Sequence, residues 1–454
     1  MEKRLEVTEH DEAGNVTATY ISTPTDTKGT SRVDVILPEK TKSPWQRLLD
    51  VFLPAGFPHS VTDDYVQYQI YDSLQAFSSS IAGLLSSRAV LSSVGVGDST
   101  ASPTAALLLS ILQDSAGRIA TIFFAHRFGT ALEPECKMYR LLADILNDFA
   151  FILDCLSPAF PKPIRVVILS FSSVLRALCG VAAGSAKASL SAHFARWGNL
   201  GELNAKDSSQ ETVISLLGMM AGSLVVSWVT TPMATWTTLI LLLAIHLETN
   251  RRAVRAVSMR TFNRQRATLV YHELKQGRIP RPEDISKQER IFERDGVLRD
   301  EDDRITGYCT VGASMKTFLS SLAFRKRSLT GAMSVDDTWL TDLLSLSAES
   351  AYILSYDSSS DPLRFDIVIK KGATPGDLLL AWWQALALSE EASKLRTWSY
   401  SLDKRQDVLD LVKETATAAA QLMSRYGAEL REASWDLDVG ALETRSSTRV
   451  SLPE

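Results

Sequence analysis

The densest group of residues that could do chemistry lies between two apolar stretches, from residue 187 to residue 211. It combines cations, carboxylates, a histidine and amides: Lys187, His193, Arg196, Asn199, Glu202, Asn204, Lys206, Asp207, Gln210 and Glu211. Ionisable side chains at or near membrane depth are costly, and they tend to pair with one another or to serve a pathway. These residue types therefore suit the binding of a small charged molecule or a lipid head group.

A second set, mostly acidic, lies on the apolar stretches that come before this group. Its members are Asp98, Asp114, Arg118, Asp144 and Asp148. Together the two sets predict a polar pocket inside a helical domain, which would bind an anionic small molecule or a lipid head group. The alternative is a network of buried ion pairs that fixes the helix register. Ser208 and Glu211 also have the spacing of a capping box, so part of the group has a local explanation.

The sequence contains no motif of a familiar enzyme class. There is no GxSxG elbow, Walker A loop, HExxH pair or dinucleotide fingerprint. The four cysteines (Cys136, Cys155, Cys179 and Cys309) form no CxxC pair and have no histidine at ligand spacing, which argues against a disulfide framework or a metal site. A net charge of −5 gives no footprint for nucleic-acid binding. We therefore expect a protein that is not an enzyme and that needs no cofactor.

The elements that must position these residues are organised around the stretch Ala205–Leu247. After its charged opening AKDSSQET, no formally charged side chain occurs up to Leu247. A bilayer span needs about 20 apolar residues, which is more than an ordinary core helix supplies. Pro232, in the Thr-Thr-Pro sequence, favours two short spans, Val213–Val229 and Met233–Leu247, joined by a tight turn. A single helix kinked at the proline is the alternative.

Four further apolar helices are predicted before this stretch. They cover Asp64–Val94, Pro103–Phe128, Leu141–Leu156 and Ile164–Leu190. Glycine, alanine and serine are frequent in them, and small residues let membrane helices approach closely. A soluble helical bundle is the alternative, because individual helices carry charges.

After the arginine-rich segment that follows Leu247, the pattern changes to short strands and amphipathic helices. Strands are predicted over Ile305–Val311, Tyr352–Tyr356 and Phe365–Ile369, with a last helix over Leu402–Ala433. The predicted fold class is mainly α: a polytopic helical membrane domain followed by a small α+β domain. The predicted divisions are a polar N-terminal segment with a possible β-hairpin (1–43), the helical domain (44–266), a charged linker (267–304), the α+β domain (305–433) and a polar tail (434–454).

Five ordered motifs resemble the Root UVB sensitive family. They are FLPAGFPHSVTDDYVQYQIYDSLQA (Phe52–Ala76), GVGDSTASPTAA (Gly95–Ala106), QDSAGRIATIFFA (Gln113–Ala125), KMYRLLADILND (Lys137–Asp148) and HFARWGNLGELNAKDSSQET (His193–Thr212). The resemblance is good from Trp45 to Arg266 and loose in the C-terminal domain. Lys187 stands where the family commonly has arginine, and Glu202 where it commonly has aspartate.

The resemblance implies an integral protein of a plastid, another organelle or the endomembranes, with a link to vitamin B6 homeostasis. We expect it to bind or move a small metabolite or lipid through the polar pocket. The alternative is a non-catalytic membrane scaffold that assembles with a paralogue, or with a second copy, through its C-terminal domain.

Overall fold

The structure, a computed structural model, describes residues 5–10, 16–24, 31–36, 51–93, 102–322, 333, 335, 337–357, 360–397 and 405–452. The chain divides into two compact units, and each is described by itself. The helical unit comprises Met1–Leu107, Asp148–Ser172 and Lys187–Ala256. The mixed unit comprises Leu108–Asn147, Ser173–Ala186 and Val257–Glu454. The fold class predicted from the sequence is confirmed: the protein is mainly helical and has a small α+β region towards its C-terminus.

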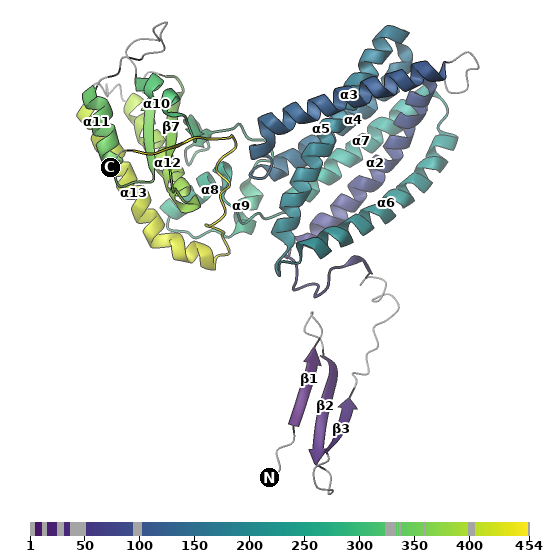
Figure 1. Cartoon of the computed structure of the whole chain (residues 1–454), viewed down its shortest axis with the longest axis horizontal. Coiled ribbons are helices and arrows are strands. Elements are labelled where there is room, and N and C mark those ends of the chain that lie inside the picture. Colours follow the sequence, from purple (N-terminus) through teal and green to yellow (C-terminus); the bar gives the residue numbers. More distant parts are fainter. Residues whose placement is uncertain are drawn as a thin grey trace. The chain divides into compact units, whose positions relative to one another are not determined.

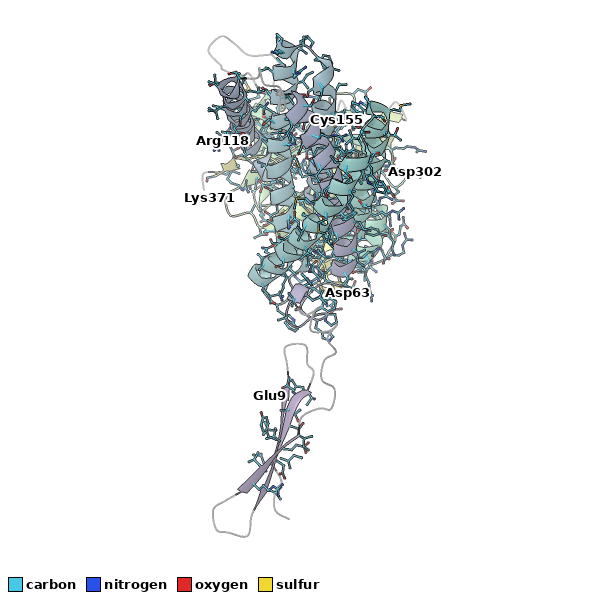
Figure 2. The ribbon with its side chains drawn as sticks, turned by 90° about the vertical axis from the view of Figure 1, so that its right-hand side faces the viewer. Glu9, Asp63, Arg118, Cys155, Asp302 and Lys371 are labelled. Atoms are coloured by element: carbon cyan, nitrogen blue, oxygen red, sulfur yellow. The ribbon has the colours of Figure 1, made fainter. Side chains whose placement is uncertain are left out.

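The N-terminal segment forms an antiparallel sheet of three strands in the order β1-β2-β3. The strands are β1 (Leu5–His10), β2 (Val16–Pro24) and β3 (Ser31–Ile36). Strands β2 and β3 pair as an antiparallel hairpin, as predicted for this segment, and β1 adds a third strand. The Tyr20 hydroxyl on β2 donates a hydrogen bond to the carboxylate of Glu9 on β1. Figure 2 labels Glu9 on this sheet.

The helical unit is built on three long helices. These are α2 (Tyr65–Ser93), α6 (Leu200–Trp228) and α7 (Pro232–Ala256). The end of α4 (Cys136–Leu156), the short 3-10 turn η2 (Ser157–Ala159) and both ends of α5 (Lys162–Phe194) complete it. Helix α2 packs along both α6 and α7 (Figure 1).

The stretch Ala205–Leu247 contains the predicted pair of helices and not one kinked helix. Helix α6 ends at Trp228, and α7 begins at Pro232, where proline suits the first helical turn. Arg88 on α2 holds the turn between them. Its guanidinium donates to the carbonyls of Val226 (2.9 Å) and Val229 (2.6 Å), which α6 leaves without helical partners.

Two glycines allow α2 and α6 to pack closely. A Cβ placed on Gly218 would lie 2.7 Å from Ser80 Cβ, and one on Gly222 would lie 2.7 Å from Leu84 Cδ1. Both glycines are four residues apart on one face of α6. This is the small-residue spacing that brings helix backbones together in membranes.

Apolar side chains of the long helices point outward. On α6 the exposed ones include Leu216, Met220, Leu224 and Trp228, the last 86% exposed. Within the described part of the chain, three helical segments are long and apolar enough to cross a membrane: Thr104–Ala131, Lys162–Phe194 and Leu200–Trp228. The second predicted span, Met233–Leu247, is not among them, because polar residues follow Leu247 directly.

The mixed unit contains three kinds of element. Its helices from the apolar region are α3 (Pro103–Phe128), the start of α4 and the middle of α5, with the 3-10 turn η1 (Gly129–Ala131). Its later helices are α8 (Arg264–Lys275), α9 (Pro282–Gln288), α10 (Met315–Leu322), α11 (Asp337–Leu346), α12 (Pro375–Thr397) and α13 (Arg405–Glu432). Its strands are β4 (Val297–Arg299), β5 (Ile305–Val311), β6 (Tyr352–Asp357), β7 (Leu363–Lys370) and β8 (Arg449–Val450).

The strands form one sheet in the order β4-β5-β7-β6, with β8 paired to β7. Strands β5 and β7 run parallel, whereas β4–β5 and β6–β7 are antiparallel. The three predicted strands and the long last helix are all present. On β7, Phe365, Ile367 and Ile369 are completely buried, as the alternation of the sequence predicts.

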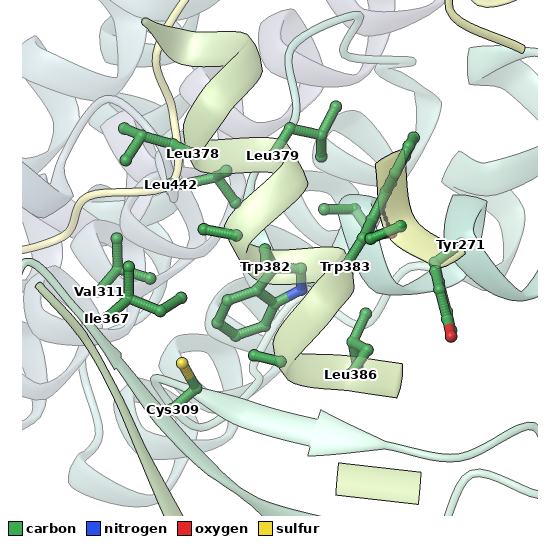
Figure 3. Close-up of a cluster of buried hydrophobic side chains, with 14 of the residues drawn as sticks. Tyr271, Cys309, Val311, Ile367, Leu378, Leu379, Trp382, Trp383, Leu386 and Leu442 are labelled. Atoms are coloured by element: carbon green, nitrogen blue, oxygen red, sulfur yellow. Dashed lines mark hydrogen bonds between the residues drawn. The ribbon is translucent and has the colours of Figure 1, made fainter. Parts of the chain in front are cut away.

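Helix α12 forms the centre of the mixed unit's core. Trp382 and Trp383 are fully buried there, among Leu378, Leu379 and the sheet side chains (Figure 3). Their indole N–H groups donate to α8: Trp382 to Thr268 Oγ1 at 3.0 Å and Trp383 to the carbonyl of Ala267 at 3.0 Å. The tryptophans thus fix α8 against α12 as well as filling the core.

The predicted linker over 267–304 is in fact part of this domain. Helices α8 and α9 and strand β4 lie in it, and Val270, Leu274, Ile285 and Leu298 are buried in the shared core. The segment is rich in charged residues, but it also has an apolar face, which packs against the sheet and α12.

The predicted polar tail over 434–454 is also folded. Trp435 is buried, stacks on Phe262 at 4.5 Å between ring centres and donates its N–H to the carbonyl of Pro280. Leu437 and Leu442 are buried nearby. The tail contains few apolar residues, but those few complete the core.

Candidate functional site

Lys187 on α5 binds two carboxylates of α6. Its Nζ lies 2.7 Å from Asp207 Oδ2 and 2.7 Å from Glu211 Oε2. The other oxygen of Asp207 accepts a hydrogen bond from the Gln69 amide on α2. Asp207 and Glu211 are four residues apart and therefore share a helix face. The structure brings these three predicted site residues together.

His193 and Arg196 bind the two aspartates that come before α2. His193 Nε2 lies 3.0 Å from Asp64 Oδ2, and Arg196 Nη2 lies 3.2 Å from Asp63 Oδ1. Asp63 marks one end of the helical unit in Figure 2, with Cys155 towards the other. Carboxylates suit this position because a helix N-terminus carries a partial positive charge. These pairs tie the end of α5 to the start of α2.

Three side chains of α6 bind main-chain groups of the segment Val51–Ala55. The bonds are Lys206 Nζ to Val51 O (2.9 Å), Gln210 Nε2 to Phe52 O (2.6 Å) and Ala55 N to Glu202 Oε1 (2.7 Å). Asn199 occupies the N-cap position of α6 without a capping hydrogen bond, and its side-chain amide atoms are buried with no hydrogen-bond partner among the described residues. Several residues of the predicted polar group therefore hold the segment Val51–Ala55 against α6.

The described members of the second predicted set are divided between the two units. Asp98 lies outside the described residues. Asp114 and Asp144 belong to the mixed unit, where Asp144 accepts from Arg140 at 3.2 Å. Arg118 belongs to the mixed unit as well, and of the described members of this set only Asp148 lies in the helical unit.

The space beside Lys187 and Asp207 is small. The cavity that they line with Tyr65, Tyr68 and Gln69 has a volume of about 10 Å³. That is room for about one water molecule. In this conformation the predicted group is therefore a packed polar network.

A second polar chain lies deeper in the helical unit and joins α2, α7 and α4. Gln75 Nε2 lies 2.8 Å from His246 Nε2, and His246 Nδ1 lies 2.7 Å from Asp148 Oδ1. All three residues are buried, and the His246 side chain is 0% exposed. Buried histidine and carboxylate groups within apolar helices are expensive, which makes them candidates for function.

The chain Gln75–His246–Asp148 can hold a variable number of protons. When the Gln75 amide donates to His246 Nε2, the imidazole is neutral and carries its proton on Nδ1, beside Asp148. When Gln75 instead turns its carbonyl oxygen to Nε2, the protonated Nε2 donates to it, and the cationic imidazole forms an ion pair with Asp148. The same three side chains thus accommodate two protonation states with only an amide rotation.

Asp154 is a second buried carboxylate in this unit. Its two oxygens accept hydroxyl hydrogen bonds at 2.6 Å, one from Ser86 on α2 and one from Ser172 on α5. Asp148 and Asp154 both lie on α4, so this helix supplies two buried carboxylates to the unit. The described residues contain no group of three or more histidines, cysteines and carboxylates that could hold a metal ion.

Sequence reasoning named Asp148 but missed Gln75, His246 and Asp154. His246 could not be recognised from formal charge in the stretch Ala205–Leu247, because histidine counts as neutral there. The available signal was a titratable side chain within an apolar helix, which applies to His246 and Asp154 alike.

Comparison with known proteins adds a family to this geometry. A family model described as "Vitamin B6 photo-protection and homoeostasis domain" matches residues 38–277, more than half of the chain. RUS family member 1 of Dictyostelium discoideum is 41% identical over 259 residues, which cover 56% of this chain and 49% of that protein. Protein root UVB sensitive 3 of Arabidopsis thaliana is 37% identical over 250 residues, which cover 55% and 57%.

A third relative matches over a longer stretch. Protein root UVB sensitive 2, chloroplastic, of Arabidopsis thaliana is 26% identical over 339 residues, 74% of this chain and 72% of that protein. The chain spans about half the length of the first two relatives. No solved structure matches significantly. The family model and the relatives agree with the five sequence motifs, and the chain belongs to the Root UVB sensitive family.

Proposed function

We propose that the helical unit is embedded in a membrane and that its polar interior binds or moves a small metabolite of the vitamin B6 type. The proposed role is that of a binding or transport protein and not of an enzyme. The family model's description supports the choice of metabolite. The proposed location is an organelle membrane or endomembrane, and one relative, protein root UVB sensitive 2, is named as chloroplastic.

One observation carries this proposal: the helices expose large apolar side chains and bury polar ones within a partly apolar interior. Leu224 and Trp228 of α6 and Met233 of α7 are exposed, whereas His246 and Asp148 are buried between helices. A soluble protein gains stability from the opposite arrangement, since it buries apolar surface. In a bilayer, lipid covers the apolar faces and the polar side chains find partners inside.

The interior offers chemistry that suits a hydroxylated pyridine ring. Gln75 provides an amide that donates and accepts, His246 takes or gives a proton, and Asp148 accepts. Because the cavity beside Lys187 and Asp207 admits about one water, loading a metabolite requires the helices to move apart. The proposal therefore includes an open state of the helical unit.

The first test is membrane attachment. After expression of the full chain, membranes washed at alkaline pH should retain the protein in the pellet. Recovery in the supernatant would overturn the membrane part of the proposal.

The second test is binding by the detergent-solubilised chain, with radiolabelled pyridoxine, pyridoxal and pyridoxamine as probes. We expect His246→Gln and Asp148→Asn to bind at least one of them about tenfold more weakly than the unmodified protein does. His59→Gln, an exposed histidine of the same unit, is the matched control and should bind normally. Lack of binding by the unmodified protein at millimolar probe would overturn the choice of metabolite.

A further inference from the structure

The mixed unit contains a cavity of about 190 Å³ that is rich in arginine. Five arginines line it: Arg127, Arg264, Arg294, Arg299 and Arg445. Only three carboxylates do so, namely Glu135, Glu293 and Asp295. Ligand pockets usually measure about 300 Å³ or more, so this one suits a small molecule.

Two of the carboxylates are already neutralised within the wall. Arg299 binds Glu293 through two nitrogens, at 3.0 and 3.1 Å, and Arg290 also reaches Glu293 at 3.1 Å. Arg264, itself buried, binds Asp295 and donates its Nε to the carbonyl of Leu442 at 2.8 Å. These pairs lie in the lining of the cavity, and in them the charges of Glu293 and Asp295 are balanced by arginines.

The other arginines have weaker partners. Arg127 lies over the ring of Phe128, at 5.7 Å from its centre, and no carboxylate of the described chain lies within ion-pair distance of it. Arg445 approaches Asp295 only to 3.4 Å and is more than half exposed. Arg294 lies over the Tyr308 ring at 4.5 Å and donates to its hydroxyl.

Glu135, the third carboxylate, does not offset this excess fully. Burial raises the pKa of its carboxyl, although the charge of Arg266 opposes the shift. Its Oε2 accepts a hydrogen bond from Asn263 at 3.1 Å. Aromatic surface from Phe128 and Tyr139 lies in the same wall. The cavity lining therefore combines an excess of arginines with aromatic side chains.

We propose that this cavity binds a phosphate monoester, with the phosphate held by Arg127, Arg294 and Arg445 and an attached apolar group resting on Phe128 and Tyr139. Arginine suits this ligand because its planar fork makes two parallel hydrogen bonds to phosphate oxygens. The phosphate belongs either to a soluble aromatic metabolite or to a lipid head group. A lipid is a real alternative because the apolar segment Thr104–Ala131 ends at this cavity.

Calorimetric titration of the detergent-solubilised full chain tests the proposal. Phenyl phosphate represents the soluble source and dioctanoyl phosphatidic acid the lipid source, with phenol as the uncharged comparison. We expect at least one phosphate probe to bind and phenol not to bind. The probe that binds at least tenfold more tightly identifies the source.

The variant R127Q/R445Q removes two cations at exposed positions and should weaken phosphate binding about tenfold or more. Arg425→Gln is the matched control, because Arg425 is also exposed and lies over the next residue's ring, Tyr426, but does not line the cavity. It should bind as the unmodified protein does. Glu135→Gln removes the remaining negative charge and should tighten binding at pH 8.

The proposal fails if neither phosphate probe binds the unmodified protein at millimolar concentration. It also fails if Arg425→Gln weakens binding as much as R127Q/R445Q does, since general charge would then explain the effect. Glu135→Gln keeps the test decisive should the double variant misfold, because the proposal predicts a gain in affinity there. These outcomes do not depend on vitamin B6 binding by the helical unit.

Discussion

His246 on α7 and Asp148 on α4 face each other inside the helical unit, with Nδ1 and Oδ1 2.7 Å apart. Neither side chain is more than 5% exposed. A pair so deeply buried need not add stability relative to apolar residues of the same size. Removing one partner alone, however, leaves the other side chain buried without its ion-pair partner.

The first prediction concerns this pair. Asp148→Asn should lower the free energy of unfolding by about 3–5 kcal/mol, because His246 loses its charged partner. The double variant with His246→Gln should lose less than the sum of the two single losses. Denaturant unfolding in detergent measures all three. Asp63→Asn is the control, since Asp63 is 94% exposed and its loss should change stability little.

Additive losses in the double variant would contradict the pair's coupling. Such a result would mean that each residue is held by its own separate partners.

The second prediction concerns the close contact between α2 and α6. Gly222→Ala should cost about 1–3 kcal/mol of unfolding free energy, because its Cβ would lie 2.7 Å from Leu84 Cδ1. Gly201→Ala on the same helix meets no atom within 4 Å and should be neutral or slightly stabilising. Thermal unfolding of both variants decides this, and equal effects would argue against close packing here.

The third prediction uses a buried carboxylate of the mixed unit, Glu289. Its oxygens lie 2.6 Å from Lys137 Nζ and 2.7 Å from Arg266 Nη1. Burial alone would raise its pKa, but the two cations more than reverse this and hold the pKa below the ordinary 4.5. Glu289→Gln should therefore cost about 3–5 kcal/mol at neutral pH, because two cations are left buried without their carboxylate.

The pH dependence of this effect has a fixed sign. A depressed pKa contributes stability above the unfolded-state value, and that contribution is lost as the pH falls through the lower folded-state value. The difference between the unmodified protein and Glu289→Gln should be constant above about pH 6 and should shrink below 4.5. Glu283→Gln, at an exposed position on α9, should show neither effect. A difference that grew on acidification would contradict the assignment.

The fourth prediction concerns Arg88 and the turn between α6 and α7. Arg88→Met should speed amide hydrogen exchange around residues 229–235, because the carbonyls of Val226 and Val229 lose their donor. A cost of about 1–3 kcal/mol is expected. Arg255→Gln, at an exposed position of α7, should leave the exchange of this turn unchanged. Unaltered exchange in Arg88→Met would show that the turn holds without it.

Much of the fold is predictable because local signals and packing agree. Pro103 and Pro232 mark the first residues of α3 and α7, where a missing N–H costs nothing. The strands of the mixed unit follow from alternation of buried and polar residues. The segment 267–304 was mispredicted as a linker because it is rich in charged side chains, although one of them, Glu289, is buried in ion pairs with Lys137 and Arg266. Composition alone cannot distinguish such residues from solvated ones.

The candidate site was only half predictable for a related reason. Lys187 and Asp207 lie on consecutive helices, α5 and α6, and carry opposite charges. Their pairing could therefore be expected from the sequence. The contact of His246 with Gln75 joins residues 171 positions apart. Such a contact depends on how α2, α4 and α7 pack, which no local pattern specifies.

The attachment of Val51–Ala55 to α6 has its own consequence for variation in the chain. Lys206, Gln210 and Glu202 bind carbonyl and amide groups of the main chain there. Recognition of this kind is indifferent to which amino acids occupy the segment but sensitive to their spacing. Conservative exchanges within the segment should be silent, whereas deletion of a single residue would put all three bonds out of register at once.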